Sequence, residues 1–155
     1  MQIGFGVPVS GAWATPAVAA ELSTKAERLG YSSLWTFQRL ISPVDEAGEP
    51  LLAPQYRQVQ DPLVLLAYIA ALTTRARLGV AVVNAPYYSP ALLAKMATTL
   101  DQVSSGRLDL GIGLGWMPEE FEAAGADMEG RGRRTEDFLR CLYEIWAPGY
   151  RQLRG

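Results

Sequence analysis

The chain has 155 residues, of which 49% are hydrophobic and 19% charged, and this composition fits one soluble globular domain rather than a disordered or collagen-like chain. Its net charge is -2 and it has no clustered basic stripe, so nucleic acid is not expected as a partner. The absence of histidine excludes His-dependent catalysis and His-ligated metal sites, and a single cysteine, Cys141, excludes an internal disulfide or a thiolate zinc site.

The start of the chain has no secretory pattern, and the longest apolar run, residues 62–72, is too short to span a bilayer. We therefore expect a cytoplasmic protein without a membrane partner.

Four strand-then-helix units follow one another along the chain. We predict strands over 2–7, 33–37, 77–84 and 107–113, and helices over about 16–29, 62–72, 90–103 and 133–146. Thr15, Asp61 and Ser89 each precede a proline, which is typical of a helix N-cap followed by the first helical turn. Strands that alternate with amphipathic helices indicate parallel pairing and an α/β fold.

The connections differ in length in a way that points to a site. The turns from helix to strand are short, whereas the segments from strand to helix are long: 8–15, 38–60, 85–89 and 114–132. In α/β folds the site lies at the carboxyl ends of the strands, where these long segments begin. The segment 38–60 is interpreted as a lid or binding loop, with a surface insertion of no function as the alternative.

Aromatic residues gather at the same predicted edge, and a flat conjugated ligand would find stacking surfaces there. They are Trp13, Phe37, Tyr56, Tyr87, Tyr88 and Trp116. The alternative is that these rings only cover the core. The glycine-rich stretch 111–115 ends the fourth strand and permits close approach of a ligand, although it does not form a GxGxxG motif.

Several charged residues have both a structural and a functional interpretation. Arg39 follows the second strand, where it either holds a phosphate or an acidic substrate or is an ordinary exposed arginine. Glu119 and Glu120 follow Pro118, and we prefer a role in favouring a helix N-terminus over acid catalysis. Positive charge at the start of the fourth helix is locally unfavourable, so an anion or carboxylate contact is suspected there: Arg131, Arg133 and Arg134. Cys141 is interpreted as a small buried hydrophobic residue.

A series of short motifs resembles the luciferase-like monooxygenase superfamily, and most closely its branch of oxidoreductases that use the deazaflavin coenzyme F420. The resemblance covers about residues 1–147. The motifs are 61–63 (Asp-Pro-Leu), 77–79 (Arg-Leu-Gly), 84–88 (Asn-Ala-Pro-Tyr-Tyr), 93–101, 105–108 (Ser-Gly-Arg-Leu) and 111–116 with 119–121 (Glu-Glu-Phe).

The resemblance implies the N-terminal half of a TIM (β/α)8 barrel, made of four parallel βα units. A complete barrel needs about 250 residues. The expected domain is 1–147, followed by a polar tail over 148–155. The resemblance also implies a bulge in the third strand with a cis peptide between Ala81 and Val82. It places the coenzyme ring against Ala81, Val82, Asn84, Gly113 and Gly115, and the substrate against Phe37, Arg39, Tyr56, Tyr87 and Trp116.

The function implied is hydride transfer between coenzyme F420 and a small organic substrate. The alternatives are an FMN-dependent monooxygenase of the same fold and a non-catalytic half-barrel that associates with itself. Many relatives have an acid or a histidine where this chain has Gln38 and Arg39, so the proton donor and the catalytic residue stay unassigned. The groups that bind the coenzyme phosphate are expected beyond this half.

A half-barrel leaves two strand edges and its inner face open, so we expect a homo-oligomer or a missing second half-barrel as partner. The inner face is expected to carry Phe5, Leu34, Val80 or Val82, and Leu110 or Ile112.

Overall fold

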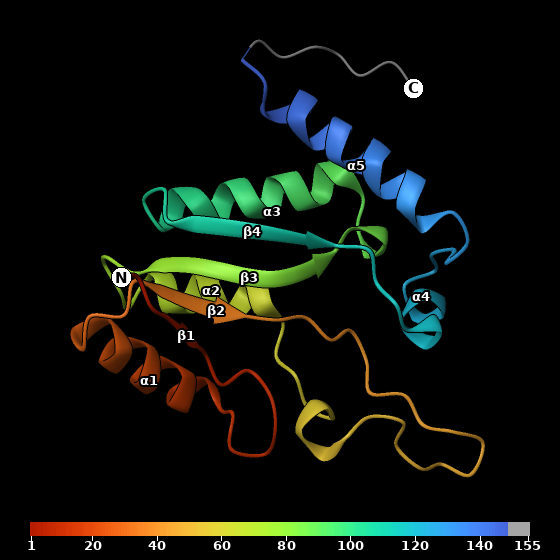
Figure 1. Ribbon diagram of the computed structural model, residues 1–155, viewed down its shortest axis with the longest axis horizontal. Helices are drawn as coiled ribbons and strands as arrows, with labels where there is room; N and C mark the ends of the chain where they lie inside the picture. The colour runs from red at the N-terminus through yellow and green to blue at the C-terminus, as the bar shows by residue number, and fades with distance from the viewer. Residues whose placement is uncertain (149–155) are drawn as a thin grey trace.

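The computed structural model describes residues 1–148, which form a four-stranded sheet with helices in the connections (Figure 1). The strands are β1 (Gly4–Gly6), β2 (Ser33–Thr36), β3 (Arg77–Asn84) and β4 (Leu108–Gly113). They lie side by side in chain order, and all neighbouring pairs are parallel. The predicted α/β fold with four parallel βα units is confirmed. The predicted polar tail lies, apart from Pro148, outside the described residues.

The helices begin largely where the sequence predicts. The side chains of Thr15, Asp61 and Ser89 each accept the backbone N–H of the residue three positions on. A short helix also forms inside the connection 114–132, and Glu119 and Glu120 lie in its first turn, as the preferred interpretation of these residues predicts. The helical elements are α1 (Pro16–Arg28), η1 (Pro54–Tyr56), α2 (Pro62–Ala70), η2 (Ala85–Tyr87), α3 (Pro90–Val103), α4 (Pro118–Ala123) and α5 (Arg131–Trp146). Within residues 1–148, no helix has the length and apolar character that crossing a membrane requires.

The hydrophobic core lies between the sheet and its helices, and Figure 1 shows α2 behind β2 and β3. Leu34, Leu78 and Val80 are completely buried in this core. Since side chains alternate between the faces of a strand, Trp35 and Gly79 lie on the opposite face, where a Cβ on Gly79 would fall 2.4 Å from the Trp35 ring. We call this second side the open face.

The prediction for the open face is wrong at most positions. Leu34 and Val80 belong to the core, and Phe5, Leu110 and Ile112 are partly buried against it. Val82, which is 36% exposed, is the predicted residue that does lie toward the open side. The physical reason is that β1 and β4 place glycine rather than a large apolar residue on the open face, so hydrophobicity marks the helix side.

Two charged side chains, the buried Glu27 and the partly buried Arg107, anchor the turns at the amino edge of the sheet. The Glu27 carboxylate accepts the backbone N–H groups of Thr74, Arg75 and Ala76 over 2.7–3.1 Å. The Arg107 guanidinium donates to four backbone carbonyls and one hydroxyl. These acceptors are the carbonyls of Ala70, Thr73, Ala76 and Ser104 and the Thr73 Oγ1. The amino edge is therefore fixed by hydrogen bonds between side chains and backbone.

Candidate active site

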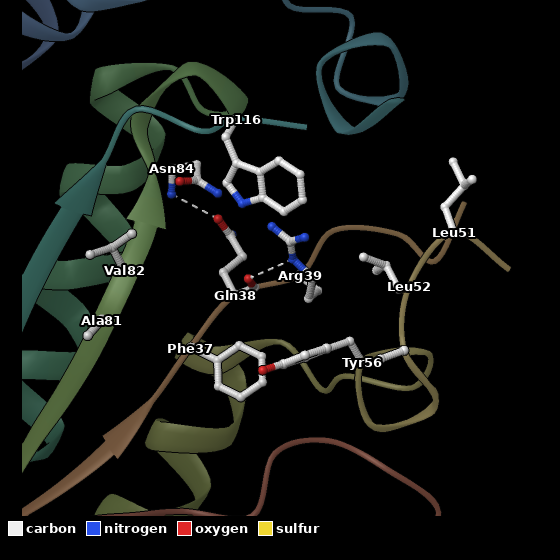
Figure 2. Close-up of a pocket in the computed structure, with 11 residues that line it drawn as sticks. Phe37, Gln38, Arg39, Leu51, Leu52, Tyr56, Ala81, Val82, Asn84 and Trp116 are labelled. Atoms are coloured by element: carbon white, nitrogen blue, oxygen red, sulfur yellow. Dashed lines mark hydrogen bonds between the residues drawn. The ribbon is translucent and has the colours of Figure 1, made fainter. Parts of the chain in front are cut away.

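A pocket of about 530 Å³ opens at the carboxyl ends of β2 and β3, on the side where the long connections leave the sheet (Figure 2). Its walls come from the exit of β2, the loop that leads to η1, the end of β3 and the segment after β4. The lining residues are Phe37, Gln38, Arg39, Leu51, Leu52, Ala53, Tyr56, Ala81, Val82, Asn84 and Trp116. This is the edge where the connection lengths predict a site.

A bulge in β3 forms one wall of the pocket. The pairing of β3 with β4 jumps from Val80 opposite Leu110 to Val83 opposite Ile112, so Ala81 and Val82 bulge out of the ladder. The peptide between Ala81 and Val82 is cis, as the resemblance implies. Both residues line the pocket, and Figure 2 shows them on the strand that ends at Asn84.

The glycines of β4 are explained by their distance to this bulge. A Cβ on Gly113 would fall 2.3 Å from Val82 Cγ2 and 2.8 Å from Asn84 Oδ1, and one on Gly111 would fall 2.4 Å from the Val80 carbonyl oxygen. Strand β4 must therefore lack side chains here to pair with the bulged β3. Gly113 lies behind the pocket wall rather than in it.

Gln38 joins the ends of β2 and β3. Its Oε1 accepts the Asn84 backbone N–H at 2.8 Å, and its Nε2 donates to the Tyr88 hydroxyl at 2.7 Å. Burial, with a smaller effect from the negative charge of Asp61, raises the pKa of Tyr88. Both ends of the Gln38 carboxamide are thus engaged, and the side chain fixes the pocket floor.

Glu120 makes contacts that the interpretation of the sequence did not anticipate. It is completely buried, and its carboxylate accepts three donors: the Leu40 backbone N–H at 2.7 Å, Arg39 Nη2 at 3.1 Å and the Tyr87 hydroxyl at 3.2 Å. It lies in the first turn of α4 as expected, but the helix N-terminus does not explain its burial. The donor residues lie about 33 and 80 positions earlier in the chain, so no local sequence pattern predicts these hydrogen bonds.

Arg39 is not a free cation. Its side chain is 11% exposed, its guanidinium pairs with Glu120, and its Cζ lies 5.0 Å from the centre of the Trp116 ring. The alternative of an ordinary exposed arginine is wrong, and the predicted phosphate or acidic substrate would meet a guanidinium that already has a carboxylate partner. Of the two interpretations of Glu119 and Glu120, neither anticipates an ion pair that closes the pocket wall.

Tyr87 does not line the pocket. Its ring packs edge-to-face on Phe121, with centroids 5.3 Å apart, and its hydroxyl binds Glu120. Burial, reinforced by the nearby Glu120 charge, raises the pKa of Tyr87 well above its usual range, so its hydroxyl stays protonated.

Seven of the ten predicted site residues line the pocket. They are Phe37, Arg39, Tyr56, Ala81, Val82, Asn84 and Trp116. Tyr87, Gly113 and Gly115 do not line it. A Cβ on Gly115, whose φ is +73°, would meet the Phe121 ring at 2.9 Å, so this glycine serves the turn into α4. Sequence reasoning missed Leu51, Leu52 and Ala53, because the 38–60 segment offers no regular pattern to orient them.

The remaining candidates lie elsewhere. Arg134 pairs with Asp127, which is the suspected carboxylate contact, and Arg131 Nη1 donates to the Met128 carbonyl at 3.4 Å. Cys141 is only partly buried, whereas the sequence interpretation expected it to be buried. Among residues 1–148 there is no group of three or more His, Cys, Asp or Glu side chains that could hold a metal.

Comparisons with known proteins identify the family of this chain. The family model described as luciferase-like monooxygenase matches residues 3–155. The chain belongs to this family. A protein of Mycobacterium tuberculosis with no assigned function is 31% identical to this luciferase-like chain over 154 residues, which is 95% of this chain and 54% of that protein. The 4-hydroxyprotoasukamycin monooxygenase of Streptomyces nodosus subsp. asukaensis is 30% identical over 125 residues, covering 81% of this chain and 30% of that enzyme.

Solved structures agree with the fold. A monooxygenase from Streptomyces bottropensis has a TM-score of 0.78 and 26% identity, covering 100% of this chain and 46% of the other. The oxygenating component of 3,6-diketocamphane monooxygenase from Pseudomonas putida, solved with FMN, has a TM-score of 0.77 and 20% identity, covering 94% and 39%. This luciferase-like chain thus spans about half the length of the first curated relatives it matches.

Proposed function

We propose that this luciferase-like chain supplies the coenzyme-ring wall and the substrate wall of an oxidoreductase that acts on a small organic molecule. The observation that carries the proposal is the bulged end of β3. There Ala81, Val82 and Asn84 line one side of a pocket whose other walls are largely aromatic and aliphatic. Family membership supports oxidoreductase chemistry at this edge.

The residues at the bulge fit a flat conjugated ring. Val82 presents apolar surface, and Asn84 brings a carboxamide that can both donate and accept hydrogen bonds. Gly113 packs so closely behind Val82 that a side chain there would push the bulge into the pocket. Trp116, which is 60% exposed, adds a second aromatic surface at the pocket.

A bound coenzyme of this class supplies the redox chemistry, either hydride transfer from F420 or oxygen activation with FMN. The residues of the chain orient the reactants and exclude water. Asn84 orients the ring, while Phe37 and Tyr56, which pack edge-to-face with centroids 5.9 Å apart, shield one side of the pocket. Gln38 has both ends of its carboxamide engaged and supplies no proton, so the catalytic residue stays unassigned.

Two coenzymes have specific support. The residue-level resemblance favours F420, with hydride transfer to or from an organic substrate. The names of the relatives favour FMN, since one is called a monooxygenase and a structure of the same fold was solved with FMN. The two candidates place the ring on the same wall and differ in whether oxygen is consumed.

The test is a fluorescence titration of the chain with FMN and with F420. We expect weak binding, micromolar or weaker, because the groups for the coenzyme phosphate are expected outside this half. The tighter ligand identifies the coenzyme, and the absorption spectrum of the complex verifies it. Sub-micromolar affinity would show that this half suffices for binding.

Val82→Asp is the variant that locates the ring. A carboxylate on the ring wall should weaken binding by about tenfold, because a charge would have to be desolvated beneath the ring. Val64→Asp is the matched control, because Val64 is 68% exposed on α2 and does not line the pocket. Equal affinity of the two variants for the coenzyme would contradict the proposed ring site.

A further inference from the structure

We infer that the pocket selects an uncharged, mainly apolar substrate, and that Glu120 is the positioning residue that sets this selectivity by neutralising Arg39. The inference rests on the proposed function, because it names the substrate class of the same pocket.

The charge pattern of the lining is the first observation. Among the described residues that line the pocket, Arg39 is the one charged side chain. An arginine in an apolar pocket ordinarily predicts a carboxylate or phosphate ligand. Here the partner is already part of the protein, since Arg39 Nη2 lies 3.1 Å from Glu120 Oε2.

The burial of Glu120 is the second observation. Its side chain has no exposed surface, and it holds the start of the 38–60 segment through the Leu40 backbone N–H as well as through Arg39. A carboxylate that is removed from water and bonded to three donors stays in place when a ligand enters. The compensation of Arg39 is therefore a permanent part of the wall.

The consequence for an anionic ligand follows from Coulomb's law. A negative group that enters the pocket is attracted by Arg39 and repelled by Glu120, which lies 3.1 Å behind Arg39 Nη2, so the repulsion offsets part of the attraction. The anion still loses its hydration among Phe37, Leu52 and Tyr56. An uncharged molecule of the same shape does not have this cost.

The neutral polar groups complete the pattern. The Asn84 carboxamide and the Tyr56 hydroxyl line the pocket, and within residues 1–148 neither side chain has a hydrogen-bonding partner, whereas the Gln38 carboxamide is hydrogen-bonded at both its oxygen and its nitrogen. The Trp116 ring, backed by the Arg39 guanidinium, offers a flat surface. A ligand with an aromatic or aliphatic body and one hydroxyl or carbonyl group fits these features.

The experiment compares benzyl alcohol with benzoate, which have the same ring and differ in charge. Both are titrated into the ¹⁵N-labelled chain of 155 residues, and the indole N–H of Trp116, assigned with Trp116→Phe, reports binding. We expect wild type to bind benzyl alcohol at least about tenfold more tightly than benzoate. Benzoate binding as tightly as benzyl alcohol, or more tightly, would overturn the inference without any variant.

Glu120→Gln tests the role assigned to Glu120. The substitution keeps the shape, still offers an oxygen to Leu40, and leaves Arg39 uncompensated. Benzoate affinity should rise about tenfold while benzyl alcohol affinity changes little. Glu119→Gln is the matched control, because it removes the same charge from the preceding position of α4, and within residues 1–148 the Glu119 side chain makes no hydrogen bond. A merely structural role would weaken both ligands together, and an unchanged ratio in folded Glu120→Gln would contradict the assignment.

The ligand titration and the coenzyme titration can fail independently of each other. If neither FMN nor F420 binds but the preference for benzyl alcohol holds, the proposed function fails and the pocket selectivity stands. If a coenzyme binds and benzoate is preferred, the selectivity fails alone.

Discussion

Glu27 lies near the end of α1, and its carboxylate receives the backbone N–H groups of the turn that leads into β3. Burial alone would raise its pKa, but the N–H groups of Ala76, Arg75 and Thr74, together with the charge of Arg75, outweigh burial and hold the pKa below its usual value. A carboxylate whose pKa is lowered by folding stabilises the folded state above its unfolded-state pKa.

Glu27→Gln should therefore destabilise the protein by about 1–3 kcal/mol near neutral pH, because the neutral amide oxygen accepts the three backbone N–H groups more weakly than the carboxylate oxygen and no longer attracts Arg75. The difference should shrink as the pH falls below 4.5 and through the lower folded-state pKa, since the wild-type carboxylate is then protonated. Urea unfolding of wild type and Glu27→Gln at about pH 7 and about pH 3 measures the difference in unfolding free energy at each pH.

Glu21→Gln is the control, because Glu21 is exposed on the same helix. A pH-independent difference between wild type and Glu27→Gln would contradict the role of the ionised carboxylate.

Residues with local partners could be predicted from sequence, and residues with distant partners could not. Thr15, Asp61 and Ser89 bind N–H groups three residues away, so the cap-plus-proline pattern was sufficient. Glu27 and Glu120 bind partners 33 to 81 residues away. The sequence around each of them is that of an ordinary helix with an acidic side chain. Part of the pocket lining was predicted through the family resemblance rather than through local chemistry.

At the scale of elements, the pairing of β3 with β4 depends on glycine. The bulge at Ala81 and Val82 brings the β3 backbone so close to β4 that a Cβ on Gly111 would fall 2.4 Å from the Val80 oxygen, which belongs to rigid backbone. The sequence indicated a glycine-rich end of this strand, and we interpreted these glycines as room for a ligand. The close partner is the neighbouring strand, which a single sequence does not reveal.

Gly111→Ala should destabilise the protein by about 1–3 kcal/mol, because the backbone of β3 or β4 must shift to accept the methyl group. Gly6→Ala, in β1, should change stability by less than about 0.5 kcal/mol, because nothing lies within 4 Å of a Cβ there. Urea unfolding compares the two alanine variants. Equal stability would show that β4 has room for a side chain.

At the scale of the molecule, the described chain has two strands with one neighbour each. Strand β1 pairs only with β2, and β4 pairs only with β3, so the outer edges of both carry backbone groups available for pairing with another chain. Two copies related by a two-fold axis parallel to the strands would join each β4 to the β1 of the other copy and close an eight-stranded ring. This assembly is also the form that a non-catalytic half-barrel would take.

We expect this chain to sediment as a dimer or a larger species at micromolar concentration. Gly6→Lys should favour the monomer, because it places a charge on an edge strand at a position with space for a side chain. Gly132→Lys adds the same charge on α5, where a Cβ also meets nothing, and should leave association unchanged. A cooperatively melting wild-type monomer at that concentration would contradict the expected association.

The order and direction of the strands could be predicted from the sequence, but which face of each strand packs on the helices could not. Alternating strand and helix patterns gave the parallel sheet, and the resemblance gave the half-barrel, which the match to 46% of a solved relative supports. The face that each strand buries could not be predicted, because the alternation of Leu108, Leu110 and Ile112 with small or polar residues marks one face of β4 but does not tell whether that face packs on the helices or lines the inside of the barrel.

The order of the strands in space is the same as their order in the chain, and this has a consequence for synthesis on the ribosome. Each strand that emerges finds its only earlier neighbour already made, so the sheet can grow one strand at a time without waiting for distant sequence. Loop closure between successive strands involves only one helical connection each time, which keeps the entropic cost of every step similar. The growing border is always the latest strand, and within the described chain that border is β4.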